Sequence, residues 1–139
     1  MELKHPAATQ APTATFTGDV FMTPLATGVA PSRVAVALVR FTPGARTFWH
    51  VHPAGQLLHV TDGTALVGTR DGSVVRARAG DTVVCPPGEE HWHGATADSF
   101  AAHLAIQESV TDGSGQASPV TWLEPVPDDV YAAVQREGS

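Results

Sequence analysis

Residues 44–63 read GARTFWHVHPAGQLLHVTDG, and this stretch decides the fold. Side chains at alternate positions of a β-strand project to the same face, so His50 and His52 converge on one side. Gln56 keeps their parity beyond a bend at residues 53–55, which lets its amide oxygen join the two imidazoles. The stretch therefore predicts a strand that carries ligand atoms on one face.

Short apolar runs separated by turn residues surround this stretch. The chain has 13 glycines and 11 prolines, which interrupt long helices. The runs predict about nine strands. The pairs DG at 62–63, DG at 71–72 and GD at 80–81 predict hairpin turns that need either a positive φ angle or an Asx turn. The predicted fold class is all-β, a small sandwich or barrel with a usable interior.

Three more histidines lie in or beside predicted strands. His91 and His93 have the same alternate spacing in the run HWHGA, and His103 lies in FAAHLAIQE. Two histidine pairs that face one interior predict a metal site. His93 shares the face of His91, and small alanines flank His103 on its own face. We therefore expect both to act near the metal, with His93 as a general base.

Two longer patterns carry a resemblance to a known family. The pattern G-x5-H-x-H-x3-E-x6-G is matched from Gly44 to Gly63, except that Gln56 replaces the glutamate. The pattern G-x5-P-x-G-x2-H-x3-N is matched from Gly80, except that Ala95 replaces its asparagine. The chain thus resembles the cupin superfamily. This implies a single-domain cupin fold, a double-stranded β-helix or jelly-roll barrel.

A closer resemblance covers residues about 15–125. The segments GARTFWHVHPAGQ, GEEHWHGA and HLAIQE are similar to the small bacterial manganese cupins that act as hydroxynitrile lyases. The resemblance implies four metal ligands, His50, His52, Gln56 and His91. It also implies three catalytic residues, His93, His103 and Thr47.

The ligand types indicate what the metal would do. Three neutral imidazoles and a neutral amide leave a divalent ion with its full charge, whereas a glutamate would cancel one unit. At about 5 Å and an effective dielectric constant of about 20, one unit charge stabilises an anion by roughly 3 kcal/mol, about two pKa units. We expect one divalent transition metal per chain, manganese first and iron next, with nickel, cobalt or zinc as alternatives.

The expected function is a metal-dependent lyase. It would cleave, and reversibly form, the carbon–carbon bond of hydroxynitriles such as mandelonitrile, giving an aldehyde and cyanide. The metal would act as a Lewis acid and a histidine as a general base. Two alternatives stay open, a metal-dependent cupin dioxygenase and a non-enzymatic cupin that binds a small molecule.

Composition excludes several partners. A net charge of −6 argues against nucleic acid, and no long apolar run predicts a membrane span. The single Cys85 forms no internal disulfide, and the N-terminus lacks a signal-peptide pattern, so a cytoplasmic protein is expected. The expected partner is a small-molecule substrate, and the resemblance implies a homodimer or homotetramer.

The expected organisation has three parts: an irregular N-terminal arm over 1–14, a β-barrel domain over 15–125, and a short C-terminal helix and tail over 126–139. Asp128 is the expected N-cap, and Val130, Ala133 and Val134 share a face of the helix. Residues 111–118 predict an exposed loop.

The remaining candidate residues have structural interpretations. Trp49 and Trp92 have opposite parity to the ligands and are expected to pack behind the site, while Trp122 fits either the cavity mouth or an interface. We expect His59 to point away from the metal and Cys85 to be buried. The four strand arginines at positions 40, 46, 76 and 78 are expected at solvated edges.

Overall fold

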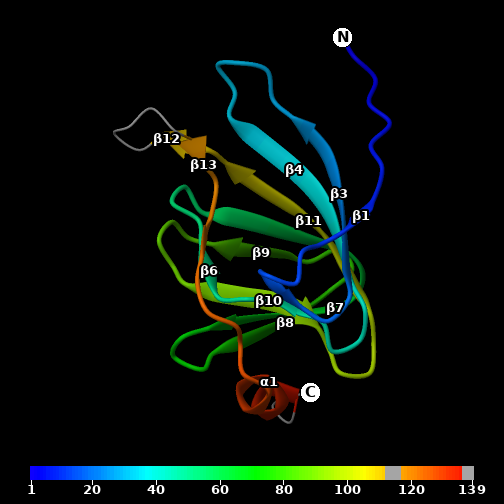
Figure 1. The fold of residues 1–139 in the computed structure, drawn as a ribbon, viewed down its shortest axis with the longest axis vertical. Helices are drawn as coiled ribbons and strands as arrows, with labels where there is room; N and C mark the ends of the chain where they lie inside the picture. The colour runs from blue at the N-terminus through cyan, green and yellow to red at the C-terminus, as the bar shows by residue number, and fades with distance from the viewer. Residues whose placement is uncertain (112–116, 136–139) are drawn as a thin grey trace.

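The computed structural model describes residues 1–111 and 117–135 and has an all-β architecture. One sheet curls into a half-barrel, with a single helix below it (Figure 1). Neighbouring strands of the sheet follow the order β1-β3-β4-β11-β7-β10-β5-β2. Strands β8 and β9 both pair with β7, outside this order. Strand β6 pairs with β10 on one side and with β14 on the other. The prediction of an all-β fold is confirmed.

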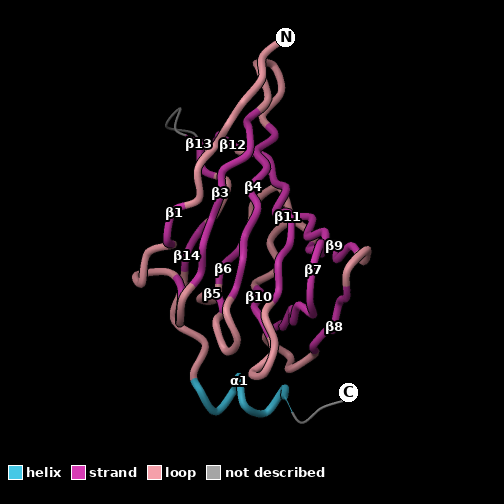
Figure 2. Tube along the Cα trace, turned by 90° about the vertical axis from the view of Figure 1, so that its right-hand side faces the viewer, coloured by secondary structure: helices cyan, strands magenta, loops and turns pink. Residues whose placement is uncertain are grey.

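The strands are mostly short because turn residues interrupt them. Their bounds are β1 Thr9–Gln10, β2 Phe16–Thr17, β3 Val20–Thr27, β4 Val34–Phe41, β5 Arg46–Thr47, β6 His50–Val51, β7 Gln56–Thr69, β8 Val74–Arg78, β9 Thr82–Cys85, β10 His91–Ala95, β11 Ala101–Glu108, β12 Val110–Thr111, β13 Ala117–Ser118 and β14 Thr121–Trp122. Strands β3, β4, β11 and β7 run side by side (Figure 2).

The longest strand, β7, differs from the prediction. The DG pair at 62–63 was expected to make a hairpin, but the chain continues through it as one strand. Gly63 does adopt a positive φ of 71°, and the pairing with β11 shifts register between Ala102 and His103. The positive φ therefore bends a continuous strand, so that its first half pairs with β9 and β11 and its second half with β8 and β10.

The other two turn predictions are confirmed. Gly72, with a φ of 87°, lies in the hairpin between β7 and β8. Gly80, with a φ of 96°, lies between β8 and β9, where the Asp81 carboxylate accepts a hydrogen bond from the backbone of Arg78. These turns keep β8 and β9 beside β7.

Alternation along the strands builds the interior. On β7, Gln56, Leu58 and Val60 are buried, whereas Leu57 and His59 face outward. The core inside the curl is made of apolar side chains from β3, β4, β7 and β11, among them Val20, Val39, Phe41, Leu58 and Val60. The same inward parity carries the polar residues of the site into this interior.

Helix α1, Asp128–Gln135, packs against the outside of the second half of the sheet. Its buried residues are Tyr131 and Val134, and Ala133 is half-buried, so the predicted face is wrong only at Val130, which is exposed. Asp128 lies inside the helix, because the carbonyl of Pro127 accepts the first helical bond, from Tyr131. No helix in the described ranges is long and apolar enough to cross a membrane.

Two other expectations concern the ends of the chain. Within the arm over 1–14, Thr9–Gln10 forms β1, which pairs with Phe21 and Met22 of β3. The predicted loop at 111–118 lies mostly outside the described residues, as do residues 136–139 of the tail.

Candidate metal centre and active site

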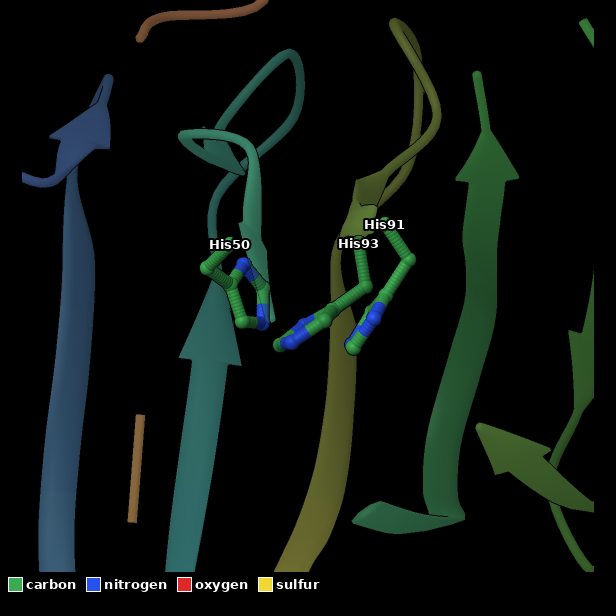
Figure 3. Close-up of side chains that lie close together, drawn as sticks. All are labelled: His50, His91 and His93. Carbon is green, nitrogen blue, oxygen red and sulfur yellow. The ribbon is translucent and has the colours of Figure 1, made fainter. Parts of the chain in front are cut away.

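Three histidines from two neighbouring strands meet inside the curled sheet. His50 lies on β6 and is the register partner of His91 on β10, two residues before His93. One ring nitrogen of each lies within 4.8 Å of such a nitrogen of the other two, and all three residues are buried. Figure 3 shows the three side chains close together. These three histidines are placed to bind a metal ion.

The other two expected ligands lie beside this group. The ring centroid of His52 is 5.1 Å from that of His50 and 5.7 Å from that of His91. Gln56, the first residue of β7, has its Oε1 3.0 Å from Nε2 of His91. The structure thus brings together all four side chains that the sequence suggested as ligands, although they come from three separate segments.

Backbone carbonyls hold three of the rings. The Nδ1 of His50 lies 2.9 Å from the oxygen of Phe48, and that of His91 lies 3.0 Å from the oxygen of Glu89. The Nδ1 of His52 bonds to the oxygen of Pro119. A carbonyl oxygen only accepts, so each ring donates its Nδ1 proton, and the neutral tautomer leaves a lone pair on Nε2.

The lone pairs of His91 and His52 have no donor among the described residues. The Nε2 of His91 faces the Oε1 of Gln56 at 3.0 Å, which sets two acceptors against each other. The Gln56 amide is oriented this way because its Nε2 donates to Oε1 of Gln107 at 3.2 Å. The Nε2 of His52 is buried and has no partner among the described residues. A cation between these atoms satisfies all of them, so the residues fit a metal ion.

Burial keeps the three rings neutral. Desolvation, together with the positive charge that neighbouring imidazoles would carry, lowers the pKa of His50 to about 3. Desolvation also lowers the pKa of His52 to about 4 and shifts that of His91 downward. Neutral imidazole is the form that ligates a metal, so the site is ready to bind at neutral pH.

A second pair of histidines extends inward from this group. Nε2 of His103, on β11, lies 3.0 Å from Nδ1 of His93. Desolvation lowers the pKa of His103 to about 4 and that of His93 well below its usual value. Among the described residues, Nε2 of His93 has no hydrogen-bond partner although it is buried. The Nδ1 of His103 is also buried without a partner among the described residues, but only His93 lines the cavity, so its Nε2 is the nitrogen placed to take or give a substrate proton.

Thr47, the third residue expected to be catalytic, is fully buried beside the histidines. Its Oγ1 accepts the backbone N–H of His93 at 3.1 Å and lies 3.5 Å from Nδ1 of His50. The hydroxyl therefore ties β5 to β10 and touches both halves of the site.

A cavity of about 340 Å³ opens onto the histidines. This volume is at the small end of the range for ligand cavities, roughly 300–1,000 Å³. Its polar wall includes Thr47, His50, His52, Gln56, His93 and Gln107, and its apolar wall includes Phe16, Met22, Val39, Ala105 and Trp122. The cavity suits a small, mostly apolar molecule that carries one polar reacting group.

The comparison with protein families settles which family has this fold and site. A model described as a cupin domain matches residues 37–106, which hold both histidine motifs. The chain belongs to the cupin family. An (R)-mandelonitrile lyase of Granulicella tundricola is 44% identical to this cupin over 134 residues, which cover 94% of this chain and 98% of that protein.

Solved structures agree with this assignment. The crystal structure of a cupin-like protein from Thermotoga maritima matches this cupin with a TM-score of 0.82 and 32% identity, over 99% of this chain and 100% of that chain. A predicted oxalate decarboxylase from the same organism matches with a TM-score of 0.66 over 76% of this chain and 96% of that chain, but it is only 20% identical. That second likeness shows the fold alone.

Sequence reasoning missed two contributors to the site of this cupin, the carbonyl of Pro119 and the side chain of Gln107, and it left Trp122, which lines the cavity, open between the cavity mouth and an interface. The carbonyl of Pro119 and the ring of Trp122 come from the segment before α1, and Trp122 lies 4.7 Å from His50 between ring centroids. Their placement depends on β14 pairing with β6. Gln107 could have been found, because it shares the inward parity of His103 and Ala105 on β11.

Most of the other predictions made for single residues are confirmed, and one is wrong. Trp49 and Trp92 pack together with the helix behind the site, and Cys85 is buried with its thiol pKa raised to about 12 by desolvation. His59 faces outward, where its Nδ1 lies 2.8 Å from Oγ1 of Thr82. Those predictions are confirmed.

The solvated position expected for Arg46 is wrong. Arg46 is buried because it bonds to the carbonyl of Val126, with its guanidinium over the ring of Tyr131.

Proposed function

We propose that this cupin is a metal-dependent lyase that cleaves, and reversibly forms, the carbon–carbon bond of a hydroxynitrile such as mandelonitrile. The products of cleavage are an aldehyde and hydrogen cyanide. The observation that carries the proposal is the free, buried Nε2 of His93 beside the converging lone pairs of the other histidines, at the wall of an apolar cavity. The 44% identity with an (R)-mandelonitrile lyase along nearly the whole chain supports the same reaction.

The proposed metal ligands are Nε2 of His50, His52 and His91, together with Oε1 of Gln56. Each of these rings donates its Nδ1 proton to a backbone carbonyl, which is how ligating histidines are usually oriented. His93 lies equally near, but its Nδ1 is engaged with another histidine instead of a carbonyl. We assign it to proton transfer and leave the four other side chains as ligands.

Manganese is the first choice for the metal and iron the second. A set of three imidazoles and one neutral oxygen suits ions that accept mixed nitrogen and oxygen ligands and keep open positions. A bound divalent metal supplies Lewis-acid chemistry, which lowers the pKa of a neighbouring hydroxyl group and stabilises a departing anion.

The protein residues supply the proton transfer. When His93 donates its Nδ1 proton to Nε2 of His103, its own Nε2 holds a lone pair toward the cavity. This nitrogen takes the hydroxyl proton of the substrate as the carbon–oxygen double bond forms. The carbon–carbon bond breaks, and its electron pair leaves with cyanide. The proton on His93 then passes to cyanide, so the reaction needs no further reactant.

His103 and Thr47 position this base. His103 is fully buried and holds the His93 ring through the 3.0 Å contact. Thr47 holds the backbone of His93 through Oγ1. The apolar wall around Phe16 and Trp122 binds the organic part of the substrate and excludes water from the reacting bond.

The test combines metal analysis with an assay under anaerobic conditions. Purified protein is analysed for bound metal, and cyanide release from mandelonitrile is measured before and after chelation. We expect stoichiometric metal and oxygen-independent cleavage that is lost on chelation and restored by Mn²⁺. A metal-loaded protein that releases no cyanide would contradict the lyase, and turnover that consumes oxygen would point to a dioxygenase.

A further inference from the structure

A segment near the C-terminus completes the metal centre. Residues 119–126, which we call the C-terminal strap, run from β13 past β6 toward α1 (Figure 1). The strap contributes the Pro119 carbonyl that holds the His52 ring, from 67 positions along the chain. It also contributes the Trp122 ring that lies against His50. One proposed ligand is thus oriented only while the strap is docked.

Backbone pairing docks the strap onto the segment that carries two ligands. In the pairing of β14 with β6, Trp122 is opposite His50 and Thr121 is opposite Val51. The pairing continues past the strand, where the amide of Leu123 donates to the carbonyl of Trp49 at 2.8 Å. The amide of Trp49 donates to the carbonyl of Glu124 at 2.9 Å. Undocking the strap would therefore free the backbone on both sides of His50.

Arg70, just after β7, clamps the strap from outside. Its Nη1 and Nη2 donate to the two carboxylate oxygens of Glu124 at 2.9 and 2.8 Å, and its Nε donates to Glu90 at 2.9 Å. The guanidinium lies 4.0 Å from the ring centroid of Trp49. This bidentate geometry is specific to arginine, and it joins the strap to the strand end and to the turn before β10.

We propose that the C-terminal strap is a positioning element of the metal centre and that Arg70 is a positioning residue that acts through it. Metal binding and strap docking then strengthen each other. If opening the strap weakens metal binding by a given factor, metal binding disfavours opening by the same factor, because coupling between two equilibria is reciprocal. The inference rests on the proposed role of His52 as a metal ligand.

The first measurement is hydrogen exchange of the full chain with and without Mn²⁺. We expect the Leu123 and Trp49 amides to exchange about tenfold more slowly when metal is bound, the scale of effect found for partners that orient metal ligands. Amides of β8 (Val74–Arg78), which carry no residue of the site, serve as the internal reference. Bound metal with unchanged exchange in the strap would overturn the inference alone. A protein that binds no metal would overturn both the inference and the proposed function.

The second measurement is the Mn²⁺ dissociation constant of Arg70→Ala by calorimetry. We expect it to rise about 3- to 10-fold, a change of the size found for residues that modulate a site without contacting its ligand. Arg78→Ala is the matched control, because Arg78 is also exposed at a strand end but lies on β8, away from the strap. An unchanged dissociation constant in Arg70→Ala, or an equal rise in both variants, would overturn the role of Arg70.

Discussion

The Nε2 of His103, on β11, lies 3.0 Å from the Nδ1 of His93, on β10, and both residues are buried. One of these two nitrogens must carry a proton that the other accepts, so the tautomer of one ring sets the tautomer of the other. When His93 is the donor, its Nε2 becomes an acceptor that faces the cavity. This contact is therefore the means by which a residue on β11 prepares the proposed base.

His93→Ala tests whether His93 transfers a proton, as proposed, or binds the metal. We expect cyanide release to fall by about 100- to 10,000-fold, the usual contribution of a general base, while metal content stays stoichiometric. His59→Ala is the control, because this histidine faces outward and contacts Thr82. Loss of the metal in His93→Ala would instead make His93 a ligand, as its position within 4.8 Å of His50 and His91 allows.

Gln56→Glu tests the value of a neutral ligand. A carboxylate adds one negative charge beside the position where alkoxide or cyanide forms. We expect tighter Mn²⁺ binding but slower cleavage, by up to about 100-fold, the equivalent of two pKa units at about 5 Å. Calorimetry and a cyanide assay measure the two effects separately. If cleavage is unchanged or faster, the charge of the centre does not limit the reaction.

Gln107→Leu tests how the Gln56 amide is oriented. The Oε1 of Gln107 accepts the amide proton that directs the Gln56 oxygen toward His91. We expect about a tenfold weaker Mn²⁺ affinity in Gln107→Leu and near-normal affinity in Gln107→Glu, which keeps an acceptor. In a Gln56→Glu background the Gln107→Leu change should have little effect, because a carboxylate has no amide to orient. An equal loss in both backgrounds would refute orientation as the cause.

The metal-free protein should lose stability as the pH falls below about 6.5. Burial lowers the pKa of His50 to about 3 and those of His52 and His103 to about 4, whereas the unfolded chain binds these protons near 6.5. The unfolded state therefore gains protons first, at a cost of about 1.4 kcal/mol per pH unit for each excess proton. Calorimetric melting between pH 8 and 4.5 measures this. A melting temperature that stays flat over this range would contradict neutral, buried rings.

Local spacing was enough to predict which side chains point inward. The parity of His50, His52 and Gln56, and that of His91 and His93, is set by strand geometry and survives in the structure. The same alternation correctly turned His59 outward. Where glycine was taken as a turn, at Gly63, the local signal identified the positive φ but not the continuation of β7, because pairing with β10 and β11 holds the strand together.

The charge of a side chain predicted its burial less well than the alternation of residues along a strand did. Arg46 was expected in solvent because arginine is usually exposed, but the chain folds residues 126–131 over it. The C-terminal helix is present as predicted, but its buried face was wrong at Val130, because Tyr131 packs against Trp92 and leaves Val130 exposed. Both errors come from packing between elements far apart in the sequence.

By itself, the sequence determined the all-β fold class and the inward parity of the histidines, because strand alternation and turn chemistry act over a few residues, and its two motifs indicated the cupin family. Only the tertiary structure decided how those groups are held. The His93–His103 contact, the Gln56–Gln107 amide pair and the Pro119 carbonyl on His52 each join segments that pairing brings together from distant positions. Such contacts depend on the register between strands, and local propensity carries no information about it.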